Sequence, residues 1–490
     1  MAEKVDTSIA DTPGWWLKQL EAKIEDRQRR YKELTRYDIG DHPLPEGDER
    51  CRPMFQAFQR KARSNYISLV IEAVLERMKI VGFRTGADST NAADKEAWRI
   101  WQANRLDARS ALVHRAMLVN SHAYVMVGKS KDPKRAMTPI ITPESPRQVA
   151  VETDPLDQLT TLAGAKIVQD KRLDATVAVL GLPDLIYTFI KPNSGSDWQL
   201  KDEPQPNTAK VVPFVEFVNR PQLDHAGPSQ FGTPQYVRGA IGHGLSEMAS
   251  VVDIQDRIND TILNRLVIAK VQAYRQRWVK GIKTEDESGQ PIDLPFIPGV
   301  DMLWAVEDVD AQFGDFAVTD LGPIMKAVEA DIRDLAAISR TPPHYLLSEL
   351  SNVSGDALNQ SETGLSMKGW ERIGTTSDPW EQVMGIVGIH IGNEALSAPD
   401  TEILWKDPEA RTRAELADAS VKESAAGVTW RFRMERLGFS PQEIDRMDAE
   451  RQAEQLMAAV TAAQAPQGQQ PVQPNPASVD ADPVVAPAIP

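Results

Sequence analysis

The stretch SEMASVVDIQDRINDTILNRLVIAKVQ, residues 246–272, carries the pattern that decides the fold. Its apolar residues step by three or four positions, and acidic and basic residues occupy the other faces. The apolar set is Val251, Ile254, Ile258, Ile262, Leu266 and Ala269. This spacing predicts one amphipathic helix, roughly 40 Å long at ~1.5 Å per residue.

A second helix with the same kind of pattern is predicted further along the chain, over residues 321–340. Pro323 lies in its first turn, where proline is favoured, and Thr341-Pro342-Pro343 ends it. The segment between the two helices, residues 273–320, is rich in glycine, proline and short apolar runs such as LPFIPG at 294–299. We expect a small β-containing insertion there, suited to contacting another molecule.

The remaining sequence predicts a mixed α+β protein. Helical spacing covers residues 15–37, with Asp11 or Thr12 as cap, and then 55–78 and 91–104. Short β-prone runs occupy 123–127, 150–152 and 185–190. A helix beginning near 354 should be interrupted at Asp378-Pro379 and resume over 380–396. A strand at 402–405 and a helical region at 408–455 follow, and a Pro-, Ala- and Gln-rich tail, residues 456–490, is predicted to be disordered.

Composition limits the class of protein. A chain of 490 residues should contain two to four sub-domains, and 41% hydrophobic with 26% charged residues is ordinary globular usage. No window is apolar enough for a membrane span, and no signal peptide is apparent, so we expect a cytosolic origin. The single cysteine, Cys51, excludes an intrachain disulfide. The net charge of −15 argues against tight binding of nucleic acid.

Motifs for catalysis or cofactors are incomplete. The run VGKS at 127–130 ends like a phosphate-binding loop, but Ala123 stands where its first glycine belongs. The GHG at 242–244 has Glu247 in place of the third glycine of a dinucleotide site. The seven histidines form no zinc motif, and Asp308 and Asp310 lack further acidic partners for a metal. We therefore expect no cofactor, no metal and no enzyme activity.

The order of elements resembles that of the portal proteins of long-tailed bacteriophages. Local strings agree in order and spacing from about residue 15 to 450. They include YDIGDHPLP at 37–45, NYI at 65–67, ERMKIVGF at 76–83, AWRIWQ at 97–102, VPFVEFVNR at 212–220, DRIN at 256–259, ISRTP at 338–342 and SGDAL at 354–358.

The resemblance implies an α+β portal fold with a wing, a long-helix stem, a small β-rich clip and a helical C-terminal region. Carried over, the regions are 1–245 wing, 246–272 stem helix, 273–320 clip, 321–340 second stem helix, 341–355 tunnel loop, 356–398 long helix of the wing, 399–455 C-terminal wing or crown, and 456–490 tail. Within the tunnel loop, we expect His344, Tyr345, Asn352 and Ser354 to lie near the channel lumen.

The resemblance also implies a function. Portal subunits form rings, usually of twelve, at one capsid vertex, through which double-stranded DNA is packaged and ejected. Expected partners are the packaging ATPase (terminase), then a head–tail adaptor, together with the major capsid and scaffolding proteins, in a virion assembled in host cytoplasm. Twelve copies would carry 12 × −15 = −180 charges, so DNA would pass through without being held. The alternatives are another virion structural or adaptor protein, or a subunit of a DNA-processing enzyme.

Overall fold

The computed structural model divides into two units, Met1–Gly438 and Phe439–Pro490. It describes residues 5–45, 52–85, 92–130, 132–133, 138–157, 159–195, 197–223, 244–273, 277–281, 290, 310, 312–315, 317–347, 355–409, 413–439 and 441–464. The predicted α+β class is confirmed, and the strand pairings within these residues are antiparallel.

The first helix, α1 (Pro13–Asp38), confirms the helix predicted over residues 15–37. Thr12 caps it, because its side-chain oxygen accepts a hydrogen bond from the Trp15 backbone N–H. Pro13 occupies the first turn, where its missing N–H has no intrahelical partner to lose. One end of α1 packs on the large sheet and the other on the helical core.

The single helix predicted over residues 55–78 is wrong, because the chain forms two helices, α2 (Arg52–Ala62) and α3 (Tyr66–Leu75). Asn65 separates them, since its side chain accepts the Ser68 backbone N–H and so caps α3. The backbone N–H of Ser64 bonds instead to Asn259, on a distant helix. Side-chain bonds of this kind interrupt a helix without disturbing the apolar period that predicted it.

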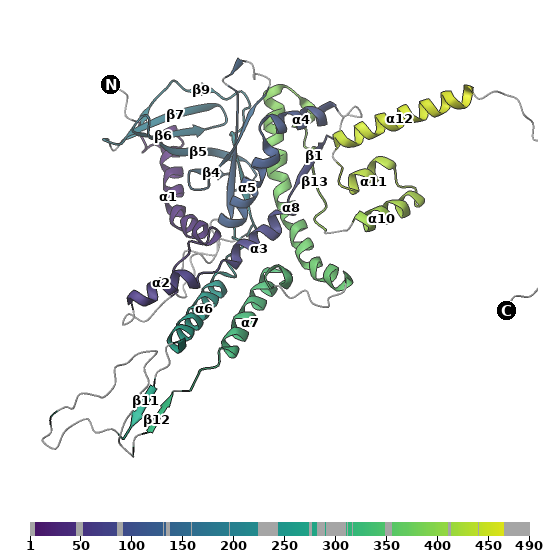
Figure 1. Cartoon of the computed structure of the whole chain (residues 1–490). Coiled ribbons are helices and arrows are strands. Elements are labelled where there is room, and N and C mark those ends of the chain that lie inside the picture. The colour runs from purple at the N-terminus through teal and green to yellow at the C-terminus, as the bar shows by residue number, and fades with distance from the viewer. Residues whose placement is uncertain are drawn as a thin grey trace, which may run out of the picture. The chain divides into compact units, whose positions relative to one another are not determined.

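Two antiparallel sheets lie in the first half of the chain. The larger has six strands in the order β4-β5-β6-β7-β8, with β9 also pairing β7, and α1 packs across it (Figure 1). Its strands are β4 (Val149–Thr153), β5 (Thr161–Asp170), β6 (Ala175–Gly181), β7 (Leu185–Pro192), β8 (Gln199–Leu200) and β9 (Gln205–Pro206). The smaller has the order β10-β2-β3, formed by β10 (Phe214–Val218), β2 (His122–Gly128) and β3 (Ile140–Glu144). The predicted strands at 123–127, 150–152 and 185–190 correspond to β2, β4 and β7.

Two helices that follow strand β1 (Ile80–Arg84) contribute to the main hydrophobic core. These are α4 (Ala92–Ala103), which confirms the helix predicted over 91–104, and α5 (Leu106–Asn120), which the sequence interpretation missed. Strand β1 pairs with β13 (Glu402–Trp405), the strand predicted at 402–405. This pairing closes the core by joining segments more than three hundred residues apart.

The two helices predicted around the insertion form an antiparallel pair. Helix α6 (Val252–Ala273) begins six residues later than predicted, and α7 (Gly322–Ser339) begins with Pro323 in its first turn. Figure 1 shows the two side by side. Between them in sequence, β11 (Arg277–Lys280) pairs with β12 (Gln312–Asp315), which confirms β-structure in the insertion. Most of residues 273–320, including Asp308, lies outside the described residues.

The predicted interruption at Asp378-Pro379 is wrong, because α8 (Gly355–Ile391) runs through it. Proline removes one helical hydrogen bond, but the flanking residues hold the helix in place. Trp380 is fully buried, and its indole Nε1–H donates to His114 Nε2 at 2.9 Å. The short α9 (Glu394–Ser397) follows.

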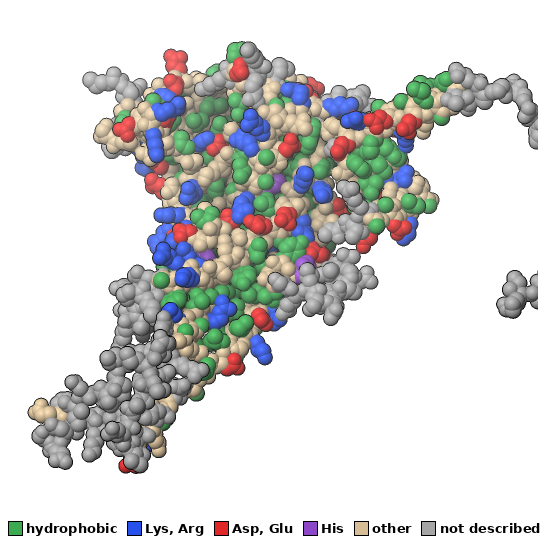
Figure 2. Space-filling model, viewed as in Figure 1, with side chains coloured by type: hydrophobic (Ala, Val, Ile, Leu, Met, Phe, Trp, Pro, Cys, Tyr) green, Lys and Arg blue, Asp and Glu red, His purple; other side chains and the backbone are tan. Residues whose placement is uncertain are grey.

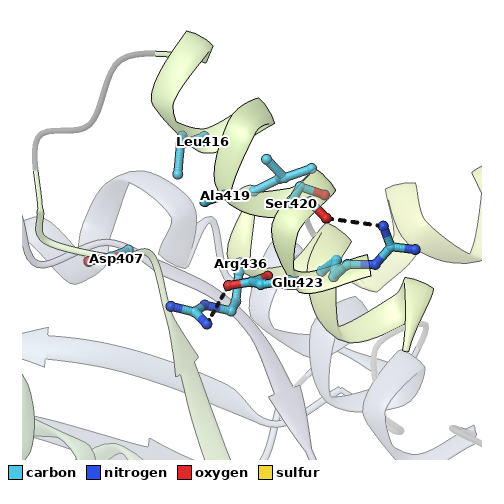
Figure 3. Close-up of a pocket in the computed structure, with 8 residues that line it drawn as sticks. Asp407, Leu416, Ala419, Ser420, Glu423 and Arg436 are labelled. Carbon is cyan, nitrogen blue, oxygen red and sulfur yellow. Dashed lines mark hydrogen bonds and ion pairs between the residues drawn. The ribbon is translucent and has the colours of Figure 1, made fainter. Parts of the chain in front are cut away.

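The helical region predicted over 408–455 consists of three helices. In the first unit, α10 (Arg413–Ala425) and α11 (Trp430–Arg436) pack together. Arg436 and Glu423 form an ion pair between them at 2.6 Å, and Figure 3 draws this pair. The pocket drawn there is about 10 Å³, the lower limit for one water molecule. In the second unit, α12 (Pro441–Gln464) shows that the tail prediction is wrong for residues 456–464. The run LMAAVTAAQ contains strong helix formers and no proline. Residues 465–490 lie outside the described part.

Candidate functional site

The α6–α7 pair is the element that the sequence singled out, and a narrow apolar seam holds it together. The side chains of Ile258 and Leu335 are fully buried, and Ile332 is nearly so. An ion pair between Arg257 and Asp331, 2.8 Å apart, links the two helices beside this seam. At the end toward the insertion, the Gln272 side chain donates to the Thr319 carbonyl oxygen across the pair at 3.2 Å.

A buried polar cluster fixes α6 to the N-terminal helices. Asn259 accepts the Ser64 backbone N–H at 2.9 Å, and its amide nitrogen lies 2.7 Å from His42 Nε2. Gln255 accepts the Tyr66 backbone N–H at 2.8 Å. Burial, together with the positive charge of Arg63, lowers the pKa of His42 to about 4. A neutral imidazole can accept the Asn259 amide hydrogen, so at neutral pH the cluster joins α6 to the body without a buried charge.

Helix α7 ends in a tight, capped turn. Arg340 adopts a left-handed conformation with φ of 54°, and the Thr341 N–H returns to the Ala336 carbonyl oxygen at 2.9 Å. The Ser339 hydroxyl donates to the Thr341 hydroxyl oxygen at 2.9 Å. The chain then enters the segment for which a tunnel loop was predicted.

A second buried cluster joins this turn to α8 and to the segment before α6. The carboxylate of Glu247 lies 2.7 Å from Lys368 Nζ and 2.5 Å from Arg372 Nε, both on α8. Lys368 also donates to the Ser339 carbonyl oxygen at 3.0 Å, and the Asn219 amide donates to Glu247 at 3.2 Å. Burial opposes the charge of Glu247, but the two cations and their hydrogen bonds outweigh it and lower the carboxyl pKa to about 2. The Glu247 carboxyl is therefore ionised across the physiological range.

Of the four residues expected near the channel, the structure describes two. His344 Nε2 lies 3.1 Å from Glu362 on α8, and the Tyr345 hydroxyl accepts a hydrogen bond from Arg77 at 3.2 Å. Arg77 also forms a 2.5 Å ion pair with Glu362. In the single chain, both side chains thus belong to a polar cluster that attaches the loop to the body. Their place relative to a lumen stays a prediction, and Asn352 and Ser354 lie outside the described residues.

The clusters around Glu247 and Glu362 were missed from sequence. The available signal was weak: Lys368 and Arg372 interrupt the apolar face of a helical pattern that contains Leu365 and Ile373. Charged residues at such positions are buried only when they are paired, which indicates a partner elsewhere in the chain.

The structure describes only part of the incomplete cofactor motifs noted in the sequence. Ala123, at the position of the missing phosphate-loop glycine, is buried in β2 opposite Phe217. Gly242, His243 and Cys51 lie outside the described residues. Within the described part of the chain, no group of three His, Cys, Asp or Glu residues is arranged to hold a metal ion. No helix in that part has the length and apolar character needed to span a membrane.

Comparison with known proteins decides the family. Residues 17–456 match the family described as "Phage portal protein, SPP1 Gp6-like". The chain belongs to this portal family. The match includes both helices of the α6–α7 pair, the insertion between them and α8. The predicted family and portal function are therefore confirmed.

Related portal proteins are similar over most of their length. The portal protein of Mycobacterium phage L5 is 29% identical over 432 residues, covering 84% of this chain and 82% of its own. That of Mycobacterium phage D29 is 27% identical over 405 residues, covering 79% and 78%. Two solved structures also match at 11% identity and 84% coverage of this portal chain. They are the neck of a native GTA particle with C12 symmetry (TM-score 0.41, 99% of that chain) and the neck of an empty GTA particle with C6 symmetry (TM-score 0.44, 94%).

Proposed function

We propose that this chain is the subunit of a ring, of twelve copies, that forms a DNA channel at one vertex of a phage capsid. The observation that carries the proposal is the family match over residues 17–456, which spans the complete α6–α7 pair and its insertion. Within this proposal, α6 and α7 are the stem, the β11–β12 segment is the clip, and residues 341–355 are the tunnel loop. The ring serves as a passage for double-stranded DNA and has no catalytic activity of its own.

Exposed apolar side chains support assembly into a ring. Met325 and Ile338 on α7 are about half exposed, as is Trp370 on α8, and Figure 2 shows hydrophobic side chains gathered over α6 and α7. Exposed large apolar side chains are typical of protein–protein contact surfaces. The ring would bury these side chains between successive subunits.

The polar clusters give the stem a fixed attachment to the wing. The Asn259 cluster holds α6, and the Glu247 cluster holds both the segment before α6 and the end of α7. Buried, hydrogen-bonded networks of this kind specify one geometry, because any displacement leaves polar groups unpaired. Twelve stems held at a constant angle would line a channel of constant width.

The acidic composition is appropriate for a channel through which DNA must move freely. Phosphate neutralisation by Lys and Arg supplies most non-specific affinity for DNA, and this chain has 70 Asp and Glu residues against 55 Lys and Arg. DNA would therefore move through the ring without stopping at successive phosphates. The clip would meet the packaging ATPase during filling and the head–tail adaptor afterwards, and the capsid and scaffolding proteins would surround the wing in the virion.

Native mass spectrometry tests the ring. Twelve copies of 54.3 kDa give 12 × 54.3 = 651.6 kDa. A chain that stays monomeric or dimeric at all concentrations, alone and with scaffolding protein, would overturn the proposal. A variant in which a short Gly-Ser linker replaces residues 277–315 should still form the ring but lose binding to the packaging ATPase. If that variant binds the ATPase normally, the clip assignment is wrong.

A further inference from the structure

A pocket of about 240 Å³ opens beside the Glu247 cluster. Four segments line it. Arg220 follows β10, Glu247 and Ser250 precede α6, Arg340 follows α7, and Lys368 and Arg372 lie on α8. On the same measure a single water needs about 10–15 Å³, so the pocket has room for a small ion with some of its hydration water.

The pocket is positively charged, although the chain as a whole is acidic. Its lining contains four cationic side chains and two carboxylates, Glu247 and Glu371. Both carboxylates are already engaged, Glu247 by Lys368 and Arg372, and Glu371 by Arg372 Nη1 at 2.9 Å. Among the described residues, the guanidinium groups of Arg220 and Arg340 have no hydrogen-bond or ion-pair partner. Two forked donors therefore remain available at the mouth of the pocket.

The backbone at these two arginines is unusual. Arg220 and Arg340 have φ of 47° and 54°, in the left-handed region where glycine or asparagine is favoured. At Arg340 this conformation ends α7 as its C-cap, and Arg220 lies two residues after the end of β10. Both arginines border the same pocket.

We propose that this pocket binds a phosphate group. Guanidinium groups recognise phosphate through two parallel N–H···O bonds, and Lys368, which uses two of its three donors on Glu247 and Ser339, adds a point charge at the base. The phosphate can come from inorganic phosphate or from the backbone of duplex DNA. The inference concerns this pocket alone and does not depend on ring formation.

Titration calorimetry with inorganic phosphate at low ionic strength tests the proposal, using the full chain and the variants Arg220→Gly and Arg340→Gly. Each variant should weaken phosphate binding about tenfold, because one charge-assisted pair is lost. Each should unfold at the same or a higher urea concentration, because glycine relieves the left-handed strain. Arg333→Gln, an exposed arginine on α7 outside the pocket, is the matched control and should bind phosphate normally.

The outcomes are distinct. Phosphate binding that is absent, or unchanged in both glycine variants, overturns the proposal. Binding of acetate as tight as that of phosphate also overturns it, because the pocket would then be a carboxylate site for a neighbouring protein chain. If a short DNA duplex competes with phosphate in the parent protein and not in the glycine variants, the ligand is the DNA backbone. If phosphate binds without competition from the duplex, the ligand is the free ion.

Discussion

Lys368 on α8 donates a hydrogen bond to the carbonyl oxygen of Ser339, the last residue of α7, at 3.0 Å. The final carbonyls of a helix have no partner within the helix, and a cation near them interacts favourably with the helix dipole. The same ammonium pairs with Glu247, which precedes α6. One side chain of α8 therefore connects both proposed stem helices to the body.

Removing this ammonium should be strongly destabilising. Lys368→Met leaves Glu247 buried with Arg372 as its remaining cationic partner, and breaking a buried ion pair from one side typically costs about 3–5 kcal/mol. Urea unfolding of the purified chain measures the loss. Lys422→Met, which breaks the exposed pair with Asp418, is the control and should change stability little, because water screens that pair. Equal losses in the two variants would contradict the proposed role of Lys368.

The Glu247 cluster should also make stability depend on pH. The carboxyl pKa is about 2 in the folded chain and 4.5 when unperturbed, so ionisation favours the folded state. The contribution is complete above pH 4.5 and is lost as pH falls toward 2. Its full size is on the order of 3 kcal/mol. Urea unfolding at pH 6, 5, 4 and 3 should show the parent's advantage over Glu247→Gln shrinking below pH 4.5. A difference in stability between the parent and Glu247→Gln that stays constant from pH 6 to pH 3 would contradict this pH dependence.

In the polar cluster of Arg77, Glu362 and Tyr345, replacing Glu362 should reduce stability more than replacing Tyr345. Glu362→Gln leaves the buried guanidinium of Arg77 with a neutral partner, and hydrogen bonds to charged groups contribute about 1.5–3 kcal/mol. Tyr345→Phe removes one 3.2 Å hydrogen bond and keeps the ring under Arg77, so it should cost about 0.5–1.5 kcal/mol. Thermal unfolding compares the two variants, and a larger loss for Tyr345→Phe would show that the tyrosine is the main anchor.

Sequence periodicity predicted elements with one regular apolar face and missed elements without one. The helices α1, α4, α6 and α7 have a clear apolar stripe, and their bounds were predicted within six residues for α6 and within two for the others. Helix α5 was missed because its buried set includes the polar residues Ser110, His114 and Asn120, which blur the stripe. Strand β5 was missed because small residues such as Ala163 and Gly164 have little β-propensity and owe their place to packing. Strand β6 (ATVAVLG) was also missed, although its threonine and valines are β-prone.

The candidate site was less predictable than the fold. Glu247 and Arg372 are 125 residues apart, so no local spacing connects them, and their pairing depends on how α8 crosses the body. His344 and Tyr345 were singled out only through the resemblance to portal proteins. The structure adds Arg77 and Glu362, whose charges are compensated by residues that are distant in sequence.

Packing between the two sheets gives a last, sharply controlled prediction. Gly164 on β5 lies against Phe214 on β10, and a Cβ there would be 2.7 Å from Phe214 Cδ2, closer than atoms in van der Waals contact. Phe214 is almost fully buried and cannot move away freely, so Gly164→Ala should destabilise the chain by about 1–3 kcal/mol. Gly128→Ala, at the end of β2, would place its Cβ in open space and should have little effect. Urea unfolding of both variants measures the difference. If Gly164→Ala is as stable as Gly128→Ala, the sheets do not approach each other as closely as β5 and β10 do in this structure.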